Sequence, residues 1–248
     1  MATTKTASSL RESIGAQSAE EVSSYLDLLV YGDAGVGKTY LCGTAADHEA
    51  TRPVLLIDCE GGTTTIRHRP DVDVKRIRSL KELEELYEQL FFDTTGYYRT
   101  VALDSLTELQ DVDMKAIMEA AYERKPDKVD KDVPSPREWG IGRNHIRKIV
   151  RAFRDLPTNF IMTALADEKK EEGEPTRYAP ALPGKLQKEI PGFMNCVGYM
   201  QADPKGDEIV RTIQFQKTRR VVAKDRFDVL GPVLENPSVP LMIEKITG

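Results

Sequence analysis

The chain has 248 residues and a formal net charge of -5, which excludes a positively charged surface over the whole molecule, such as many nucleic-acid-binding proteins have. Hydrophobic residues make up 40% and charged residues 30%, a balance typical of a soluble globular protein with one full core. The three cysteines and three histidines are too scattered for a metal site, and no apolar run approaches the ~20 residues of a membrane helix. We therefore expect a cytoplasmic protein with reduced thiols and no membrane partner.

Strand and helix signals alternate along the chain, which predicts an α/β fold with a mostly parallel central sheet flanked by helices. Strands are expected at 26–30, 54–57, 72–77, 101–103, 159–164 and 194–200, and helices at 40–47, 79–92, 106–123 and 139–155. A last strand over 209–215 follows a turn at 204–206 and predicts a late antiparallel hairpin. The charged segments 125–137 and 167–183 are expected to be loops, and residues 1–22 a mobile segment before a single domain over 23–248.

The segment Gly32-Asp33-Ala34-Gly35-Val36-Gly37-Lys38-Thr39 fits G-x-x-x-x-G-K-[ST] at every defined position. It lies between a predicted strand and a predicted helix, where backbone N–H groups and the helix N-terminus favour phosphate. Lys38 is expected to reach the β- and γ-phosphates, and the Thr39 hydroxyl to ligate Mg²⁺. With Tyr40 directly after it, this segment predicts a site for a nucleoside triphosphate.

Two carboxylates follow predicted strands further along the chain. Asp104 ends the apolar strand over 101–103, where a phosphate-loop protein needs a carboxylate for the Mg²⁺ shell; the other interpretation is an N-cap of the next helix. Glu60 follows the strand over 54–57, at the edge of an open sheet where ligands gather. There it can polarise a water that attacks the γ-phosphate, unless it is only a solvated turn residue.

Four segments in order resemble the ATPase core of the RecA-like recombinases: 31–39, 56–60, 102–106 and 160–164. The resemblance covers roughly 26–227 and is strongest to the short phage-type branch of single-strand annealing proteins, because no sizeable domain flanks the core. It implies a RecA-like P-loop NTPase core that uses ATP and Mg²⁺. It also implies that Glu60 is the catalytic base, that Asp104 holds the metal, and that Thr163 senses the γ-phosphate at the end of its strand.

The predicted helix over 139–155 carries one apolar face and, on the opposite side, a row of arginines. Such a row can follow a phosphate backbone while Trp139 stacks on a base; the alternative is a solvated basic face with a core tryptophan. The arginines are Arg143, Arg147, Arg151 and Arg154. By the resemblance, 181–190 corresponds to a DNA-binding loop and helix, which makes Lys185 and Lys188 further candidates.

A basic cluster, Lys217-Thr218-Arg219-Arg220, follows the last predicted strand. The resemblance implies cations here that reach the ATP of a neighbouring subunit, with Lys217 and Arg219 as the best matches. A solvent-facing hairpin rim is the alternative. The trans arrangement implies a homo-oligomer, either a ring or a filament.

These features favour a DNA-stimulated ATPase that binds single-stranded DNA and promotes annealing or homologous recombination. By resemblance, a single-strand-binding protein is a plausible partner, and the host bacterial cytoplasm is the expected location if the chain comes from a phage. Two alternatives remain open. One is a kinase in which 167–183 is a lid over an acceptor, and the other is an ATP switch that controls a protein partner.

Overall fold

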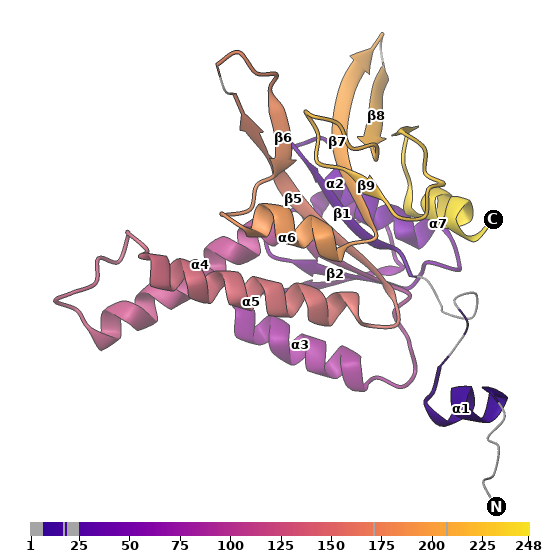
Figure 1. Cartoon of the computed structure of the whole chain (residues 1–248). Helices are drawn as coiled ribbons and strands as arrows, with labels where there is room; N and C mark the ends of the chain where they lie inside the picture. The colour runs from indigo at the N-terminus through magenta and orange to yellow at the C-terminus, as the bar shows by residue number, and fades with distance from the viewer. Residues whose placement is uncertain (1–6, 17, 19–24, 171, 207) are drawn as a thin grey trace, which may run out of the picture.

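The computed structural model describes residues 7–16, 18, 25–170, 172–206 and 208–248. A ten-stranded sheet forms its centre (Figure 1). Its strands are β1 (Asp27–Gly32), β2 (Val54–Asp58), β3 (Val72–Arg76), β4 (Thr100–Asp104), β5 (Asn159–Lys169), β6 (Arg177–Pro180), β7 (Cys196–Lys205), β8 (Glu208–Gln214), β9 (Lys224–Asp225) and β10 (Val233–Glu235). The helices are α1 (Ala7–Ser13), α2 (Lys38–Gly43), α3 (Leu80–Phe92), α4 (Leu106–Arg124), α5 (Pro136–Arg154), α6 (Leu186–Phe193) and α7 (Val239–Thr247).

The main path of the sheet has the order β10-β8-β7-β1-β5-β4-β2-β3. Strand β1 lies in the middle, parallel to both β5 and β7, and the run from β5 to β3 is also parallel. The predicted α/β fold with a mostly parallel sheet is therefore confirmed. Parallel order matters for function because it brings the carboxyl ends of β1, β2 and β4 to one edge of the sheet.

Helices cover both faces of this sheet, and the alternation along β1 shows how. Leu29 and Tyr31 pack into a core with residues of α3, α4, α5 and α6, whereas Leu28 and Val30 pack into a second core with residues of α2 and α7. All four side chains are fully buried. A strand buried on both faces is a continuous apolar run, which is why the sequence pattern located it correctly.

Two hairpins extend beyond the edge of the sheet where the glycine loop lies (Figure 1). The predicted late hairpin is confirmed, since β7 and β8 pair antiparallel through seven residue pairs. The predicted loop over 167–183 is wrong: β5 continues to Lys169 and pairs antiparallel with β6. An alternation of apolar and polar residues, which would have predicted these strands, is hidden in this hairpin. Both faces of the hairpin are partly exposed and therefore carry charged residues.

Other boundaries differ from the sequence-based expectation. The helix expected over 40–47 ends as an α-helix at Gly43 and continues as a 3-10 turn, Thr44–Asp47. Within the predicted mobile segment 1–22, residues 7–13 form α1, and most of the rest lies outside the described residues. Helix α7 was not predicted; Ser238 caps it, and it packs against the α2 side of the sheet. In the described part of the chain, no helix is both long and apolar enough to cross a membrane.

Asp27, the first residue of β1, makes the stability of the fold depend on pH. It is 8% exposed, accepts a hydrogen bond from Asn195 Nδ2 at 2.8 Å, and has one carboxylate oxygen without a partner among the described residues. Burial raises its pKa from 3.8 to about 7, and the nearby Arg154 and Arg226 only partly oppose this. Between these two values the folded state binds more protons than the unfolded state, so stability falls as pH rises and is level above about 7.

We expect Asp27→Asn to remove this dependence. The pKa rise corresponds to an upper limit of about 4 kcal/mol, so the variant should gain up to that amount relative to wild type between about pH 4 and about pH 8. Urea unfolding of both proteins across this range measures the difference. A constant difference in unfolding free energy at every pH would contradict the assignment.

Candidate active site

The glycine loop joins the end of β1 to the start of α2. Its first residues, Asp33, Ala34 and Gly35, are exposed, so the loop presents its backbone to solvent. Gly37 has φ 105°, in the left-handed region that favours glycine, directly before α2 begins at Lys38. The loop geometry therefore suits the predicted phosphate site, with backbone N–H groups and a helix start at the same place.

Lys38 lies folded over this loop. Its Nζ donates hydrogen bonds of 2.8 Å to the backbone carbonyls of Gly32 and Asp33, and the residue is only 9% exposed. Burial lowers the pKa of Lys38, and the charges of Asp104 and Glu60 oppose that shift. The amine thus lies within the electrostatic influence of both predicted carboxylates, and the negative charge of a bound phosphate would further favour its protonated form.

Asp104 is the last residue of β4, and its charge acts on Lys38. The Thr39 hydroxyl donates to Asp104 Oδ2 at 2.6 Å, and the Thr163 hydroxyl donates to Oδ1. Burial raises the pKa of Asp104, and these two hydrogen bonds oppose the rise. A carboxylate and a hydroxyl oxygen side by side are the hard ligands that Mg²⁺ prefers, so the donor set fits the predicted metal.

No group of three or more His, Cys, Asp or Glu side chains in the described residues is arranged to hold a metal on its own. Thr39 and Asp104 therefore suit a metal that also takes ligands from the substrate's phosphates and from water.

The structure places Thr163 differently from the expectation. Strand β5 runs on to Lys169, so Thr163 lies in the middle of the strand and not at its end. It is fully buried, and its hydroxyl is hydrogen-bonded to Asp104. In this structure Thr163 therefore positions Asp104, and its predicted contact with a γ-phosphate stays a prediction.

Glu60 follows β2, and Asp104 ends the neighbouring strand β4. The Cys59 N–H donates to the Asp104 carbonyl at 2.7 Å, which holds the two strand ends together. The Ser105 hydroxyl donates to Glu60 Oε1. The structure thus brings Glu60 to the same edge as Lys38, Thr39 and Asp104, with its carboxylate oriented by a hydroxyl and the residue exposed.

Asp58 fixes the backbone that carries Glu60, a function that the sequence analysis missed. Its Oδ1 accepts the N–H groups of Glu60 and Gly61 at 3.0 and 2.6 Å, and its Oδ2 accepts from Arg76 Nη1 at 2.9 Å. Asp58 is 4% exposed, so removing one of its partners leaves a buried carboxylate poorly satisfied. Asp58 lies opposite Arg76 in the β2–β3 register. Knowledge of that register would have been needed to predict this contact.

This clamp leads to a prediction for Gly61. Its φ is 93°, and a Cβ there would lie 2.5 Å from Arg76 Nη1, so Gly61→Ala should displace the clamp and shift Glu60. We expect ATP hydrolysis to fall about tenfold, because small displacements of a reacting group are costly, while nucleotide binding stays near wild type.

Gly62→Ala is the matched control for this prediction, because its φ is -88° and the nearest atom to an added Cβ is Thr39 Oγ1 at 4.0 Å. Steady-state hydrolysis and nucleotide binding are to be measured on both variants. Equal rates for the two would contradict a clamp on Glu60.

Two arginines that the sequence analysis missed lie against the glycine loop and Tyr40. Arg211, on β8, donates from Nε to the Val36 carbonyl at 3.2 Å. Its guanidinium lies 6.0 Å from the centre of the Tyr40 ring, and that of Arg69 lies 5.3 Å from the same ring. Tyr40 is 43% exposed, which leaves an aromatic surface beside the loop. This arrangement adds positive charge and a stacking surface to the predicted nucleotide site.

Lys217 and Arg219 do not join this site within one chain. Both are exposed in the segment after β8, and among the described residues neither has a hydrogen bond or ion pair to a site residue. Backbone hydrogen bonds tie this segment to β6: Tyr178 N–H donates to the Arg220 carbonyl at 2.6 Å, and Val222 N–H donates to the Tyr178 carbonyl at 3.2 Å. The two cations therefore remain candidates for contact with another subunit.

The arginine row on α5 is largely turned toward α6. Arg147 pairs with Glu189 at 2.6 Å, and Arg151 lies over the Phe193 ring at 4.3 Å. Arg154 pairs with Asp155. In this structure these arginines hold α6 and a neighbouring carboxylate, and their contact with a phosphate backbone stays a prediction.

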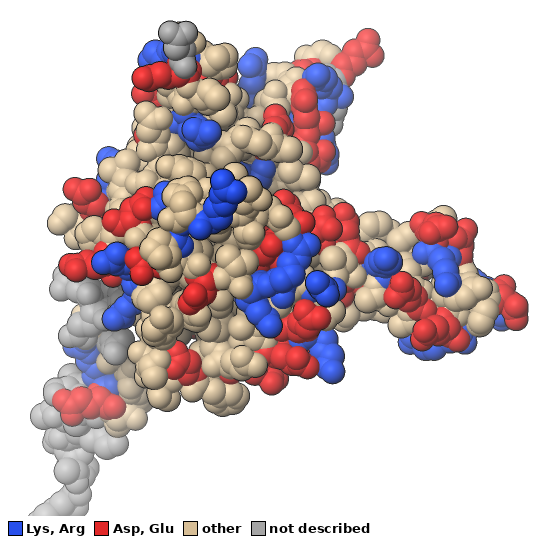
Figure 2. Space-filling model, turned by 180° about the vertical axis from the view of Figure 1, so that it is seen from behind, with Lys and Arg blue, Asp and Glu red and all other residues tan. Residues whose placement is uncertain are grey.

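Lys185 and Lys188, at the start of α6, are exposed, as is Trp139 at 43%. Over the face seen in Figure 2, basic and acidic side chains are interspersed and form no patch of a single sign. Any contact with a nucleic acid on that face would therefore be made by a few side chains and not by a continuous basic surface.

Comparison with known proteins agrees with this geometry. The protein family described as AAA domain matches residues 24–227, a span that includes Lys38, Glu60 and Asp104. The comparison with curated proteins gave no match.

Two solved structures are distantly similar to the chain. The flagellar accessory protein FlaH from Methanocaldococcus jannaschii has 11% identity and a TM-score of 0.42, covering 83% of this chain and 82% of that chain. A KaiC-like protein from Pyrococcus horikoshii has 13% identity and a TM-score of 0.43, covering 86% and 92%. These likenesses are too distant to add to the family match, which spans most of the sequence and its phosphate-binding loop. By that match, the chain belongs to the AAA domain family of P-loop ATPases.

Proposed function

We propose that this protein hydrolyses ATP and couples the hydrolysis to binding and annealing of single-stranded DNA, as in the short RecA-like annealing proteins that its sequence resembles. The observation that supports hydrolysis most strongly is the position of Glu60. Its carboxylate lies at the same sheet edge as Lys38, Thr39 and Asp104. Ser105 donates a hydrogen bond to this carboxylate, and Asp58 accepts one from the backbone N–H of Glu60.

In this proposal the loop N–H groups bind the phosphates of ATP, and Lys38 exchanges its two carbonyl partners for phosphate oxygens. Thr39, whose hydroxyl is hydrogen-bonded to Asp104, would hold Mg²⁺, and the metal would supply positive charge to the phosphates. Glu60 accepts a proton from a water as the water oxygen bonds to the γ-phosphorus. The bond from that phosphorus to the β–γ bridging oxygen breaks, and the products are ADP and inorganic phosphate.

We further propose that the site is completed by a second copy of the chain. Exposed Lys217 and Arg219 are cations without a partner in the site of their own chain, and a cation supplied in trans stabilises charge on the transferring phosphoryl group. Hydrolysis would then depend on assembly, and assembly on DNA.

The test is the rate of ATP hydrolysis with and without single-stranded DNA. We expect stimulation by DNA and release of inorganic phosphate. Phosphate transferred to an acceptor would instead support a kinase, although the predicted lid over 167–183 is a β-hairpin. No stimulation together with no DNA binding at low salt would contradict the proposal and favour an ATP switch.

A further inference from the structure

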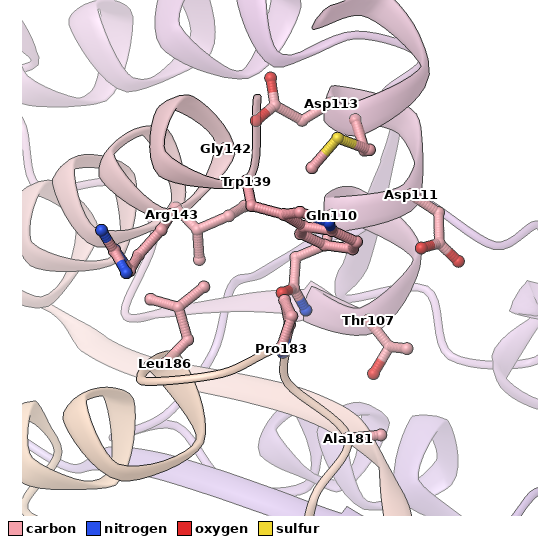
Figure 3. Close-up of a pocket in the computed structure, with 12 residues that line it drawn as sticks. Thr107, Gln110, Asp111, Asp113, Trp139, Gly142, Arg143, Ala181, Pro183 and Leu186 are labelled. Atoms are coloured by element: carbon pink, nitrogen blue, oxygen red, sulfur yellow. The ribbon is translucent and has the colours of Figure 1, made fainter. Parts of the chain in front are cut away.

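A cavity of about 150 Å³ lies where α4, α5 and the chain leading into α6 meet (Figure 3). Its walls are mostly apolar and include Met114, Gly142, Ile146 and Leu186. A cavity of this size admits one benzene-sized ring in a protein core. The volume therefore suits a single six-membered ring better than a larger fused ring system.

Two residues that line this cavity each have a buried polar side-chain atom without a hydrogen-bond partner among the described residues. These atoms are Gln110 Oε1, an acceptor, and Arg143 Nε, a donor. Gln110 is only 9% exposed, and its amide nitrogen already donates to the Leu106 carbonyl at 3.2 Å. Buried polar atoms are rarely left unpaired, so this pair points to a ligand that presents one donor and one acceptor.

Trp139 also lines the cavity and is 43% exposed (Figure 3). An exposed indole beside a ring-sized cavity is a surface on which a flat ring can stack. The exposed Lys185 lies one residue before Leu186 in the chain, while the exposed Asp111 is itself a lining residue. The charge around the cavity is therefore mixed, and it is the flat ring more than a phosphate that the cavity suits.

We propose that this cavity receives one pyrimidine base of single-stranded DNA, an inference that rests on the proposed function. The base stacks on Trp139, and its donor and acceptor edge pairs with Gln110 and Arg143. The phenyl or alkyl group of a protein partner would leave both polar atoms unpaired, which is why a base is the better occupant.

Trp139 is the only tryptophan of the chain, so tryptophan fluorescence reports on the surroundings of this one side chain. The experiment uses the full chain with a non-hydrolysable ATP analogue, oligo(dT), and an abasic oligomer with the same number of phosphates. We expect oligo(dT) to quench Trp139 and to bind at least about tenfold more tightly than the abasic oligomer, which does neither.

Three variants of the cavity and one control variant localise the effect. Gln110→Leu and Trp139→Ala should each reduce oligo(dT) affinity toward that of the abasic oligomer, with the salt dependence unchanged because phosphate contacts remain. Trp139→Phe should retain most of the preference. Tyr97→Ala, which removes an exposed aromatic outside the cavity, is the matched control and should bind as wild type.

The outcomes separate the two proposals. Equal binding of both oligomers, or a preference that survives both cavity variants, would overturn the base pocket and leave DNA binding intact. Loss of self-association in Trp139→Ala with the preference unchanged would assign the cavity to a protein contact and would also overturn it. Binding of neither oligomer by wild type would overturn the cavity assignment and the proposed function together.

Discussion

Glu60→Gln is expected to reduce ATP hydrolysis roughly 100-fold or more, because the amide cannot accept the proton of the attacking water. The substitution keeps the shape of the side chain and its hydrogen bond from Ser105. Since Lys38, Thr39 and Asp104 are untouched, ATP should still bind. A single-turnover assay of phosphate release, with nucleotide binding measured in parallel, separates these two effects.

Glu49→Gln is the control, because Glu49 is an exposed carboxylate on the loop after α2 with no contact to the site. It should hydrolyse ATP as wild type does. If Glu60→Gln retained hydrolysis within a few-fold of the control, the assignment of Glu60 as the catalytic base would be contradicted.

Asp104→Asn should reduce hydrolysis by roughly 10- to 100-fold, with a higher Mg²⁺ concentration needed for half-maximal activity. The side chain accepts from Thr39 and Thr163 on its two oxygens, and an amide offers an N–H group to one of these hydroxyls in place of an acceptor. Hydrolysis measured over a range of Mg²⁺ concentrations gives both the maximal rate and the Mg²⁺ concentration for half-maximal activity.

Thr163→Ser is the matched control for this pair of contacts, because it keeps the hydroxyl that donates to Asp104. We expect it to need no more Mg²⁺ than wild type, and Thr163→Val to lie between wild type and Asp104→Asn. If Thr163→Val changed ATP affinity but not the Mg²⁺ requirement, then Thr163 would act on phosphate and not on Asp104.

The parts of the site that lie on buried parallel strands were predictable from the sequence. The apolar runs before Gly32, Glu60 and Asp104 identify strands, and parallel order brings their carboxyl ends to one edge. The spacing of the glycine loop adds Lys38 and Thr39 to that edge. No knowledge of side-chain packing is needed for these placements.

The rest depends on contacts between distant segments. Arg211 reaches Val36 across 175 positions, and Arg147 pairs with Glu189 across 42. Such pairs follow from strand register and helix packing, which a local pattern does not contain. The β5–β6 hairpin was missed for a related reason, because its exposed faces carry charges that are also typical of loops.

The most direct test of an ATP site shared between two copies is a mixing experiment. One partner is Glu60→Gln, which keeps its cations; the other carries Lys217→Ala and Arg219→Ala and keeps Glu60. Each should be inactive alone while still binding ATP. Mixed in equal amounts with single-stranded DNA, they should recover about one quarter of wild-type hydrolysis, because one in four head-to-tail interfaces joins an intact base to intact cations. Full activity of the double variant alone, or no recovery on mixing, would contradict the shared site.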